Sequence, residues 1–221
     1  MVIKGIVFDL DGTIINSEVL QYKAFNKYLQ NHDEAYSISW EDWRTKYIGR
    51  LSPDIMNDLL KQFSINVSLD AAQRDRRLYY QEMVENGQLE VMHGFPEFFE
   101  WIKSLDLPYM IITNSHPTGV ELSLRSIGLW GEIAILTSND TVHHKPDPRA
   151  FIEASKLINV VPDECLIIED HPDNIKSAKK LGAVTIAINT ESNGIHAFSE
   201  ADLIVENYLD PRLRTFISNR L

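Results

Sequence analysis

Two aspartates interrupt the first apolar run of this chain, and this arrangement constrains the fold more than any other feature of the sequence. Residues 6–8 read Ile-Val-Phe, and Asp9, Asp11 and Gly12 follow within four positions. Such a run predicts a strand buried on both faces, and the glycine indicates a sharp turn after it. Side chains two apart along an extended chain point to the same side, so the two carboxylates repel each other unless a cation or a shared proton lies between them. A hard divalent cation held by oxygen ligands gives a reason for the pair.

The segment Asp9-Leu10-Asp11-Gly12-Thr13 resembles the first motif of the haloacid dehalogenase-like hydrolases, most of which are magnesium-dependent phosphatases. The resemblance implies that Asp9 attacks phosphorus and carries an aspartyl-phosphate, and that Asp11 is the general acid and base. A carboxylate is a competent nucleophile when a metal holds the phosphoryl oxygens, and a leaving alkoxide needs a proton. The alternative for the same residues is a solvated acidic turn, so the interpretation depends on partners further along the chain.

The composition describes an acidic protein with enough apolar residues for a sizeable core. The 221 residues carry a formal net charge of −11, and 44% of them are hydrophobic. Nucleic acids and anionic membranes are polyanions, so this charge disfavours binding to either of them. A small phosphorylated metabolite in a locally basic pocket remains compatible with the charge. We expect no nucleic-acid or membrane partner, and a monomer.

Cysteine usage and hydropathy indicate the compartment. The only cysteine of the sequence, Cys165, cannot form an internal disulfide, which suits a reducing cytoplasm. It lies in an apolar run, which favours a buried small hydrophobic residue over a reactive thiol. No apolar stretch approaches the roughly 20 residues of a membrane span, and the early aspartates interrupt any signal-peptide pattern. We therefore expect a cytoplasmic protein.

Two kinds of pattern divide the chain. From about residue 17 to 86 the apolar positions recur at helical spacing, whereas beyond residue 91 short apolar runs alternate with helical segments. Strands separated by helices predict an α/β fold with a doubly wound parallel, Rossmann-like sheet core. The helical block resembles the cap that many family members insert directly after the first motif. We therefore expect a core of residues 1–15 and 91–221 and an inserted α-helical cap domain of residues 16–90.

The expected elements of the core follow from the same patterns. Strands are expected over residues 109–112, 133–136, 166–168, 184–188 and 203–205, and helices over residues 96–103, 119–126, 148–157 and 174–181. In parallel sheets of this kind ligands bind at the carboxyl ends of the strands, and polar residues follow three of the expected strands.

The first of these polar segments after the motif is Thr113-Asn114-Ser115. A hydroxyl and backbone N–H groups at a strand end can bind a phosphoryl oxygen. The segment resembles the second motif of the family, which implies substrate binding by Thr113 and Asn114. The alternative is a helix N-cap at Ser115 or Thr118.

A second candidate segment is Lys145-Pro146-Asp147-Pro148, which resembles the third motif of the family. The resemblance implies that the Lys145 ammonium stabilises charge around the nucleophile and the phosphoryl group, so Lys145 is a candidate catalytic residue. Several carboxylates and a phosphate dianion need more positive charge than one metal supplies. The prolines restrict the loop, and His144 stands where the family usually has glycine.

The acidic pair Glu169-Asp170 ends an apolar run and resembles the fourth motif, which supplies metal ligands. Mg²⁺ prefers octahedral oxygen coordination. The resemblance implies a Mg²⁺ site formed by Asp9, the backbone carbonyl of Asp11 and Asp170, with Glu169 as a ligand either directly or through water.

The residues after the pair depart from the family pattern. Asn174 stands where the family has glycine, and because asparagine tolerates a left-handed turn better than most residues, it can replace that glycine there. Asp173 is either a further acid near the metal ligands or the N-cap of the following helix, and we favour the cap.

One candidate substrate ligand lies in the helical block. Arg50, next to Gly49, lies between two expected cap helices, where family members present a specificity loop. A guanidinium there could bind a carboxylate or a second phosphate of the substrate, and a solvated surface arginine is the alternative.

Together these motifs predict an Mg²⁺-dependent phosphatase that acts on a small phosphorylated metabolite. The chain resembles phosphoglycolate phosphatase and β-phosphoglucomutase among the members, so a phosphomutase is the alternative. The mutase carries a histidine in its first cap helix where this chain has Gln21, which favours the phosphatase. A dehalogenase would need neither Asp11 nor a metal, and a binding protein with a dead site is disfavoured by the intact motifs.

Overall fold

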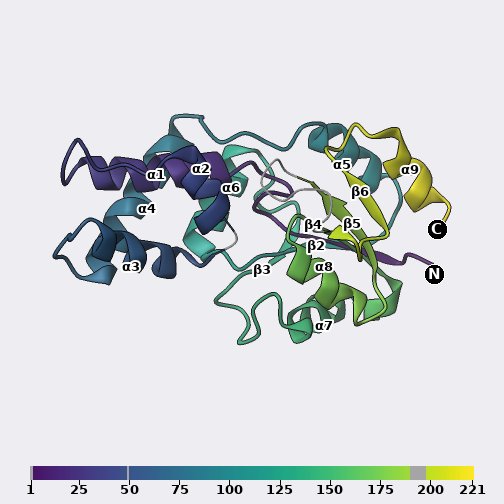
Figure 1. Ribbon diagram of the computed structural model, residues 1–221. Helices are drawn as coiled ribbons and strands as arrows, with labels where there is room; N and C mark the ends of the chain where they lie inside the picture. Colours follow the sequence, from purple (N-terminus) through teal and green to yellow (C-terminus); the bar gives the residue numbers. More distant parts are fainter. Residues whose placement is uncertain (1, 49, 190–197) are drawn as a thin grey trace. The chain divides into compact units, whose positions relative to one another are not determined.

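A computed structural model describes residues 2–48, 50–189 and 198–221 of the chain. These residues form two compact units, of which one consists of Met1–Asn16 with Glu90–Leu221 and the other of Ser17–Leu89 (Figure 1). Gly49 lies outside the described residues.

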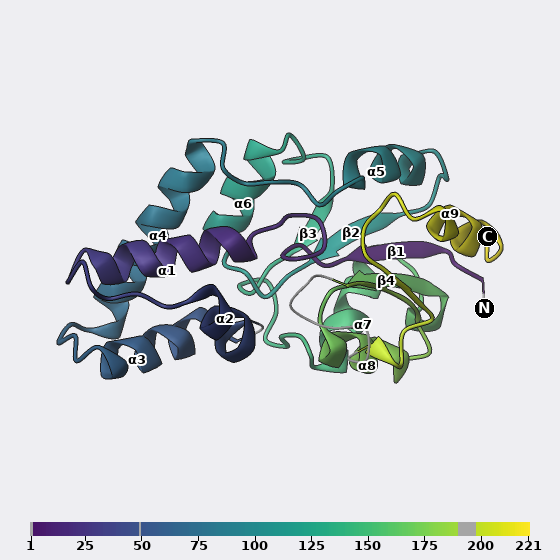
Figure 2. The ribbon, with the colours of Figure 1, turned by 45° about the horizontal axis from the view of Figure 1, so that its top comes forward.

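The first unit contains a six-stranded parallel sheet, which confirms the predicted α/β fold class (Figure 2). The strand order is β3-β2-β1-β4-β5-β6, and each neighbouring pair is parallel. The strands are β1 Gly5–Phe8, β2 Tyr109–Ile112, β3 Ala134–Leu136, β4 Cys165–Glu169, β5 Val184–Ile188 and β6 Leu203–Val205. The chain order reverses between β1 and β4, and in open α/β sheets ligands bind at the carboxyl ends of the strands at this point.

Both faces of β1 are covered, which explains why its sequence is continuously apolar. On one face Val7 belongs to a buried cluster with Phe151 and Ala154. On the other face the Phe8 ring meets the rings of Phe95 and Phe99 edge-on, at centroid distances of 5.9 and 6.3 Å. A strand buried on both sides cannot alternate polar and apolar residues.

Helices supply these two coverings. Figures 1 and 2 show α7 and α8 over one face of the sheet and α5 and α9 over the other. The helices of this unit are α5 Phe95–Lys103, α6 Pro117–Ser126, α7 Pro148–Leu157, α8 Pro172–Lys179 and α9 Pro211–Ser218, with a 3-10 turn at Pro162–Glu164. All of them have proline at the first or second helical position, where its missing N–H costs nothing.

The second unit is helical. Its elements are α1 Glu18–Gln30, α2 Trp40–Asp42 continued by a π-helical turn Trp43–Tyr47, α3 Ser52–Gln62 and α4 Leu69–Glu85. Its core is built around aromatic side chains, and the Phe25 and Trp43 rings lie 5.2 Å apart. Ser68 caps α4 by accepting from the Ala71 N–H. Within the part of the chain that the structure describes, no helix combines the length and the apolar character that crossing a membrane requires.

Candidate active site

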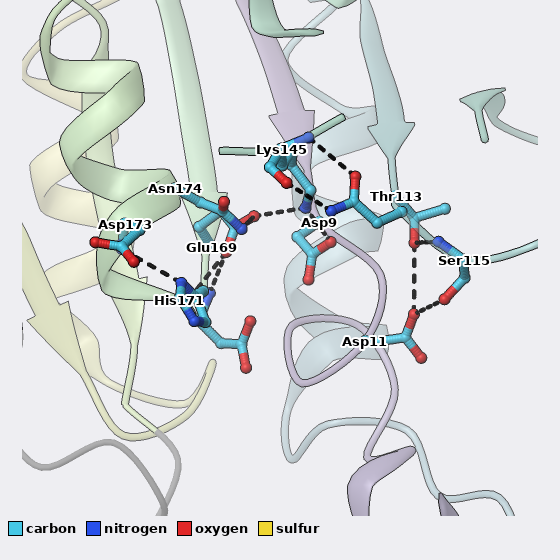
Figure 3. Close-up of polar contacts among 11 residues, drawn as sticks. Asp9, Asp11, Thr113, Ser115, Lys145, Glu169, His171, Asp173 and Asn174 are labelled. Carbon is cyan, nitrogen blue, oxygen red and sulfur yellow. Dashed lines mark hydrogen bonds and ion pairs between the residues drawn. The ribbon is translucent and has the colours of Figure 1, made fainter. Parts of the chain in front are cut away.

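Residues far apart in the sequence meet at the carboxyl edge of the sheet. Asp9 follows β1, Thr113 follows β2, and Glu169 ends β4, and these are three adjacent strands. Figure 3 shows their side chains facing one another together with Asp11 and Lys145. The strand order thus brings the predicted motifs together.

The Lys145 ammonium lies between two buried carboxylates. Its Nζ donates to Oδ1 of Asp9 and, at 2.5 Å, to Oε1 of Glu169. The exposed fraction is 3% for the Lys145 side chain, 7% for Asp9 and 0% for Glu169. Water is therefore largely excluded from this ion triad, where charge interactions are strong.

Electrostatics differ between the two ends of the Lys145–Asp9 pair. The pKa of Asp9 is raised from 3.8 to about 7, mainly by burial; Lys145 acts to lower this pKa, and the charges of Glu169 and Asp11 act to raise it. Burial opposes the charged form of Lys145, yet the charges of Asp9 and Glu169 hold its pKa above the usual value. The lysine is thus a permanent cation, whereas burial and the neighbouring carboxylates disfavour the ionised form of Asp9.

Glu169 is engaged on both oxygens. Oε1 accepts from Lys145 Nζ and, at 2.7 Å, from the side-chain amide of Asn174. Oε2 accepts from the backbone N–H groups of Asp170 and His171, each at 3.0 Å. The carboxylate therefore fixes both the lysine and the turn from β4 into α8 (Figure 3).

The role expected of Asn174 is wrong. Asn174 lies inside α8 and not in a left-handed turn, since the only described non-glycine residues with positive φ are Ser64, Asp106 and Asn159. Its side chain instead reaches back to Glu169. A sequence pattern does not reveal this contact, because the side-chain direction depends on the helix start.

Histidines cap two helices, and the expected caps are wrong. The α8 N-cap is His171, whose Nδ1 accepts from the Asp173 N–H at 3.3 Å, so Asp173 is not the cap. The α6 N-cap is His116, whose Nδ1 accepts from the Thr118 N–H at 3.3 Å, so neither alternative cap for that helix is right. Each histidine precedes a proline, which forces an extended backbone at the residue before it and suits the first helical position. This His-Pro spacing was the signal that could have located both caps.

Asp11 contacts two hydroxyl groups at the end of β2. Ser115 Oγ donates to Asp11 Oδ2 at 2.6 Å, and Thr113 Oγ1 lies 3.4 Å from the same oxygen (Figure 3). Thr113 Oγ1 also accepts from the Ser115 N–H at 3.0 Å. The sequence singled out Thr113 but considered Ser115 only as a helix cap. Its hydroxyl group, two residues after Thr113 in the same polar segment, was the available signal.

Gly12 allows the close approach of two acidic segments. Its φ is +76°, and a Cβ at this position would lie 2.1 Å from Oδ2 of Asp170. No real Cβ tolerates such a contact, and positive φ is itself strained for residues with a side chain. Glycine therefore suits the turn, and a residue with a Cβ would force the Asp170 carboxylate to move.

We expect Gly12→Ala to lower turnover on the order of 10²-fold, because displacement of Asp170 and of the adjacent Asp11 spoils the geometry of the site. The matched control is Gly128→Ala, since Gly128 has the same φ of +76° with nothing within 4 Å of its Cβ position. Both variants bear a backbone strain of about 1–2 kcal/mol, so both should melt earlier than the parent. Equal activity of the two variants, each measured on folded protein, would contradict the requirement for space beside Asp170.

A family model described as haloacid dehalogenase-like hydrolase matches residues 6–188. The chain belongs to this family. It is 26% identical over 210 residues to validoxylamine A 7'-phosphate phosphatase of Streptomyces hygroscopicus subsp. limoneus, covering 95% of this chain and 96% of that protein. It is 23% identical to hexitol phosphatase A of Escherichia coli, covering 92% and 91% of the two chains. The chain is thus an enzyme of this hydrolase family, of the phosphatase type that these relatives share.

Solved structures agree on the fold. The structure of a putative β-phosphoglucomutase from Thermotoga maritima superimposes with a TM-score of 0.83 at 20% identity, covering 97% of this chain and 100% of that chain. This similarity supports the haloacid dehalogenase-like fold.

The carboxylates of this family member fit a divalent cation. One ligand oxygen from each of Asp9, Glu169 and Asp170 can be chosen so that all lie within 4.8 Å of one another. The Lys145 ammonium forms ion pairs with two of these three residues, Asp9 and Glu169. The oxygen donors of the group suit a hard cation such as Mg²⁺.

The two other expected substrate ligands have protein partners. In the helical unit, Arg50 Nη2 donates to Asp58 Oδ2 at 2.7 Å, and its guanidinium lies 5.7 Å from the ring centre of Tyr47. In the sheet unit, both amide atoms of the Asn114 side chain bind the main chain of Lys145. Substrate binding by Arg50 stays a prediction, and the Asn114 contacts are taken up below.

Proposed function

We propose that this chain is an Mg²⁺-dependent phosphatase that hydrolyses a small phosphorylated sugar or sugar-like metabolite through an aspartyl-phosphate on Asp9. The observation that carries the proposal is the buried group of Asp9, Lys145 and Glu169, with the ammonium bonded to both carboxylates. A permanent cation beside a buried carboxylate suits a nucleophile that must receive a dianionic phosphoryl group.

Each acidic residue has a separate part in the proposed reaction. Asp9 attacks phosphorus with one carboxylate oxygen, the bond from phosphorus to the leaving oxygen breaks, and protonated Asp11 gives that oxygen its proton. Asp11 then removes a proton from water, which attacks the phosphorus of the aspartyl-phosphate and releases inorganic phosphate and free Asp9. The hydrogen bond that Ser115 Oγ donates to Asp11 Oδ2 orients the Asp11 carboxyl group for both roles.

The remaining residues of the site would bind Mg²⁺ or balance the charge of the phosphoryl group. Asp9, Asp170 and the main-chain carbonyl of Asp11 would hold Mg²⁺, and Glu169, whose oxygens already accept from four donors, adds negative charge beside it. When bound, the ion supplies positive charge that polarises the phosphoryl oxygens. Lys145 stays protonated throughout and neutralises part of the dianion.

The substrate class rests on the relatives. The names of two relatives that match over more than 90% of both chains refer to validoxylamine A 7'-phosphate and to hexitols. We propose phosphorylated hydroxyl-rich metabolites for this chain on that ground. The acidic chain and the buried site argue for a small monoester and against a nucleic acid.

The test is phosphate release from p-nitrophenyl phosphate and from a panel of hexose, hexitol and short-chain acid phosphates, with and without Mg²⁺. We expect turnover of the chromogenic ester with Mg²⁺, and higher kcat/KM for at least one hydroxyl-rich phosphate. Absence of release from every compound in the presence of Mg²⁺ would favour the alternative of a binding protein with a dead site.

A phosphomutase is the second candidate, favoured by the similarity to the putative β-phosphoglucomutase structure. A mutase must protect its aspartyl-phosphate from water while the substrate turns around. The mutase histidine position holds Gln21 here, whose Oε1 accepts from Arg76 Nη1 at 2.5 Å within the helical unit. An amide cannot exchange a proton at neutral pH as histidine does, so this residue does not support mutase chemistry.

We expect net hydrolysis when β-glucose 1-phosphate is supplied with a catalytic amount of the 1,6-bisphosphate. Inorganic phosphate should accumulate at least as fast as glucose 6-phosphate. The reason is that the Gln21 side chain cannot transfer a proton while the phosphoryl group passes from Asp9 back to the sugar. Both products are followed in the same reaction by enzymatic assay. Rapid formation of glucose 6-phosphate without matching phosphate release would reverse the order of the two candidates.

A further inference from the structure

The main chain at Lys145 is held by a side chain from another strand end. Asn114 Nδ2 donates to the Lys145 carbonyl at 2.7 Å, and the Lys145 N–H donates to Asn114 Oδ1 at 3.0 Å. Both hydrogen-bonding groups of this amide face one residue, 31 positions further along the chain. Glu169 fixes the far end of the lysine, so Lys145 is held at its main chain and at its ammonium.

The neighbours of Asn114 serve the other acid of the site. The Thr113 and Ser115 hydroxyl groups contact Asp11, whereas both amide atoms of Asn114 bind the Lys145 main chain. The three residues after β2 therefore contact both groups of the site: Thr113 and Ser115 orient Asp11, and Asn114 holds the main chain of Lys145.

We propose that Asn114 is a positioning residue that sets the location of the Lys145 ammonium beside Asp9, and that it is not a substrate ligand. Both polar groups of its amide bind the lysine main chain. The acceptor and one donor of the amide are therefore not available to a substrate. The main chain next to Lys145 is also held by Ser177 Oγ, which donates to the Pro146 carbonyl, and by the Asp147 N–H, which donates to the His144 carbonyl at 2.9 Å. Loss of the amide clamp frees the lysine main chain, and an ammonium shifted by about 1 Å costs on the order of 10²-fold in rate.

The helical unit offers a matched control. Asn26 makes the same pair of bonds to Ile38, with Nδ2 donating to its carbonyl at 3.2 Å and Oδ1 accepting from its N–H at 2.7 Å. Asn26 belongs to α1 and takes no part in the proposed chemistry. Asn26→Ala thus removes an equivalent buried clamp, with its cost in stability, from another place in the fold.

The experiment compares Asn114→Ala and Asn26→Ala in the full chain by two measurements. The first is kcat and KM on p-nitrophenyl phosphate with Mg²⁺, per mole of folded protein determined by thermal unfolding. We expect kcat of Asn114→Ala to fall 10- to 100-fold with KM within twofold of the parent, and Asn26→Ala to keep both constants. A raised KM with unchanged kcat would instead mark Asn114 as a substrate ligand, and unchanged constants would mark a merely structural clamp.

The second measurement needs no activity. Reductive methylation of lysines, followed by peptide mass spectrometry, reports how accessible the Lys145 amine is. Since the Lys145 side chain is 3% exposed and paired with two carboxylates, it should react slowly in the parent and at least 10-fold faster in Asn114→Ala, with other lysines and the Asn26→Ala protein unchanged. Equal protection of Lys145 in the parent and in Asn114→Ala would overturn the proposal. If the parent has no phosphatase activity, the proposed function fails while this labelling result still decides the role of Asn114.

Discussion

Asp9→Asn is expected to lower phosphate release by on the order of 10⁴-fold or more, since removal of a covalent nucleophile costs at least that much in other enzymes. The amide has nearly the same shape as the carboxylate but cannot form an acyl-phosphate. Steady-state phosphate release with saturating Mg²⁺ measures the effect, and trapping of ³²P on the parent protein but not on the variant tests the covalent step.

The fold of this variant is expected to be intact, and the sign of its change in stability follows from the raised pKa of Asp9. Burial raises this pKa from 3.8 to about 7 in the folded protein, so the stability contribution of the carboxyl is present below pH 3.8 and is lost as the pH rises through 7. Asparagine does not ionise, and Lys145 keeps Glu169 as its partner. In chelator at pH 8 the variant should therefore melt no earlier than the parent. Any excess of its melting temperature over that of the parent should shrink as the pH is lowered to 5.

A control separates loss of the nucleophile from loss of one negative charge. Asp163 is exposed and precedes β4 at the opposite edge of the sheet. Asp163→Asn changes the net charge equally and should keep full turnover. Substantial hydrolysis by Asp9→Asn with Mg²⁺ present would remove Asp9 from its proposed role.

Removal of divalent cations is expected to have the second largest effect. Excess chelator should reduce turnover on the order of 10²-fold or more, because the clustered carboxylates of Asp9, Glu169 and Asp170 offer the oxygen ligands that Mg²⁺ prefers. Addition of Mg²⁺ should restore activity. Ca²⁺ accepts more ligands in looser geometry and should compete for the same carboxylates without supporting turnover. Full activity in excess chelator would refute the metal requirement.

Metal binding can be measured apart from catalysis. Mg²⁺ at about 100 times its dissociation constant adds about 2.7 kcal/mol to the stability of the folded state, which corresponds to roughly 5–10 °C in a chain of this size. The chelated parent should show this rise in melting temperature on addition of Mg²⁺. Asp170→Asn should lose it, whereas Asp58→Asn, a change in the helical unit, should keep it. An equal thermal shift in Asp170→Asn would exclude Asp170 as a ligand.

The fold could be predicted from local patterns. The strands over 184–188 and 203–205 lie where the apolar runs predicted them, and α7 occupies the expected residues 148–157. Continuous apolar runs report burial on both faces, and burial is a property that each segment carries in its own residues. Boundaries next to proline were less accurate, because α6 and α8 each begin two residues before the expected start.

The candidate site could be predicted in its residue types but not in its contacts. Asp9, Asp11, Lys145 and the pair Glu169-Asp170 were recognised because each stands at a strand end or in a motif of fixed spacing. The partners of these residues were not visible in the sequence. Asn174 was expected in a turn, yet it lies in α8 and binds Glu169.

The sequence by itself determined where strands end and which acids, amides and hydroxyls stand there, because periodicity and motif spacing are local. Only the tertiary structure decided which of them meet. Lys145 reaches Asp9 across 136 positions, and Asn114 reaches the Lys145 main chain across 31. These contacts exist because the sheet places β2 and β4 on either side of β1, and several strand orders are compatible with the same local pattern. The ion triad and the amide clamp are therefore properties of the assembled sheet.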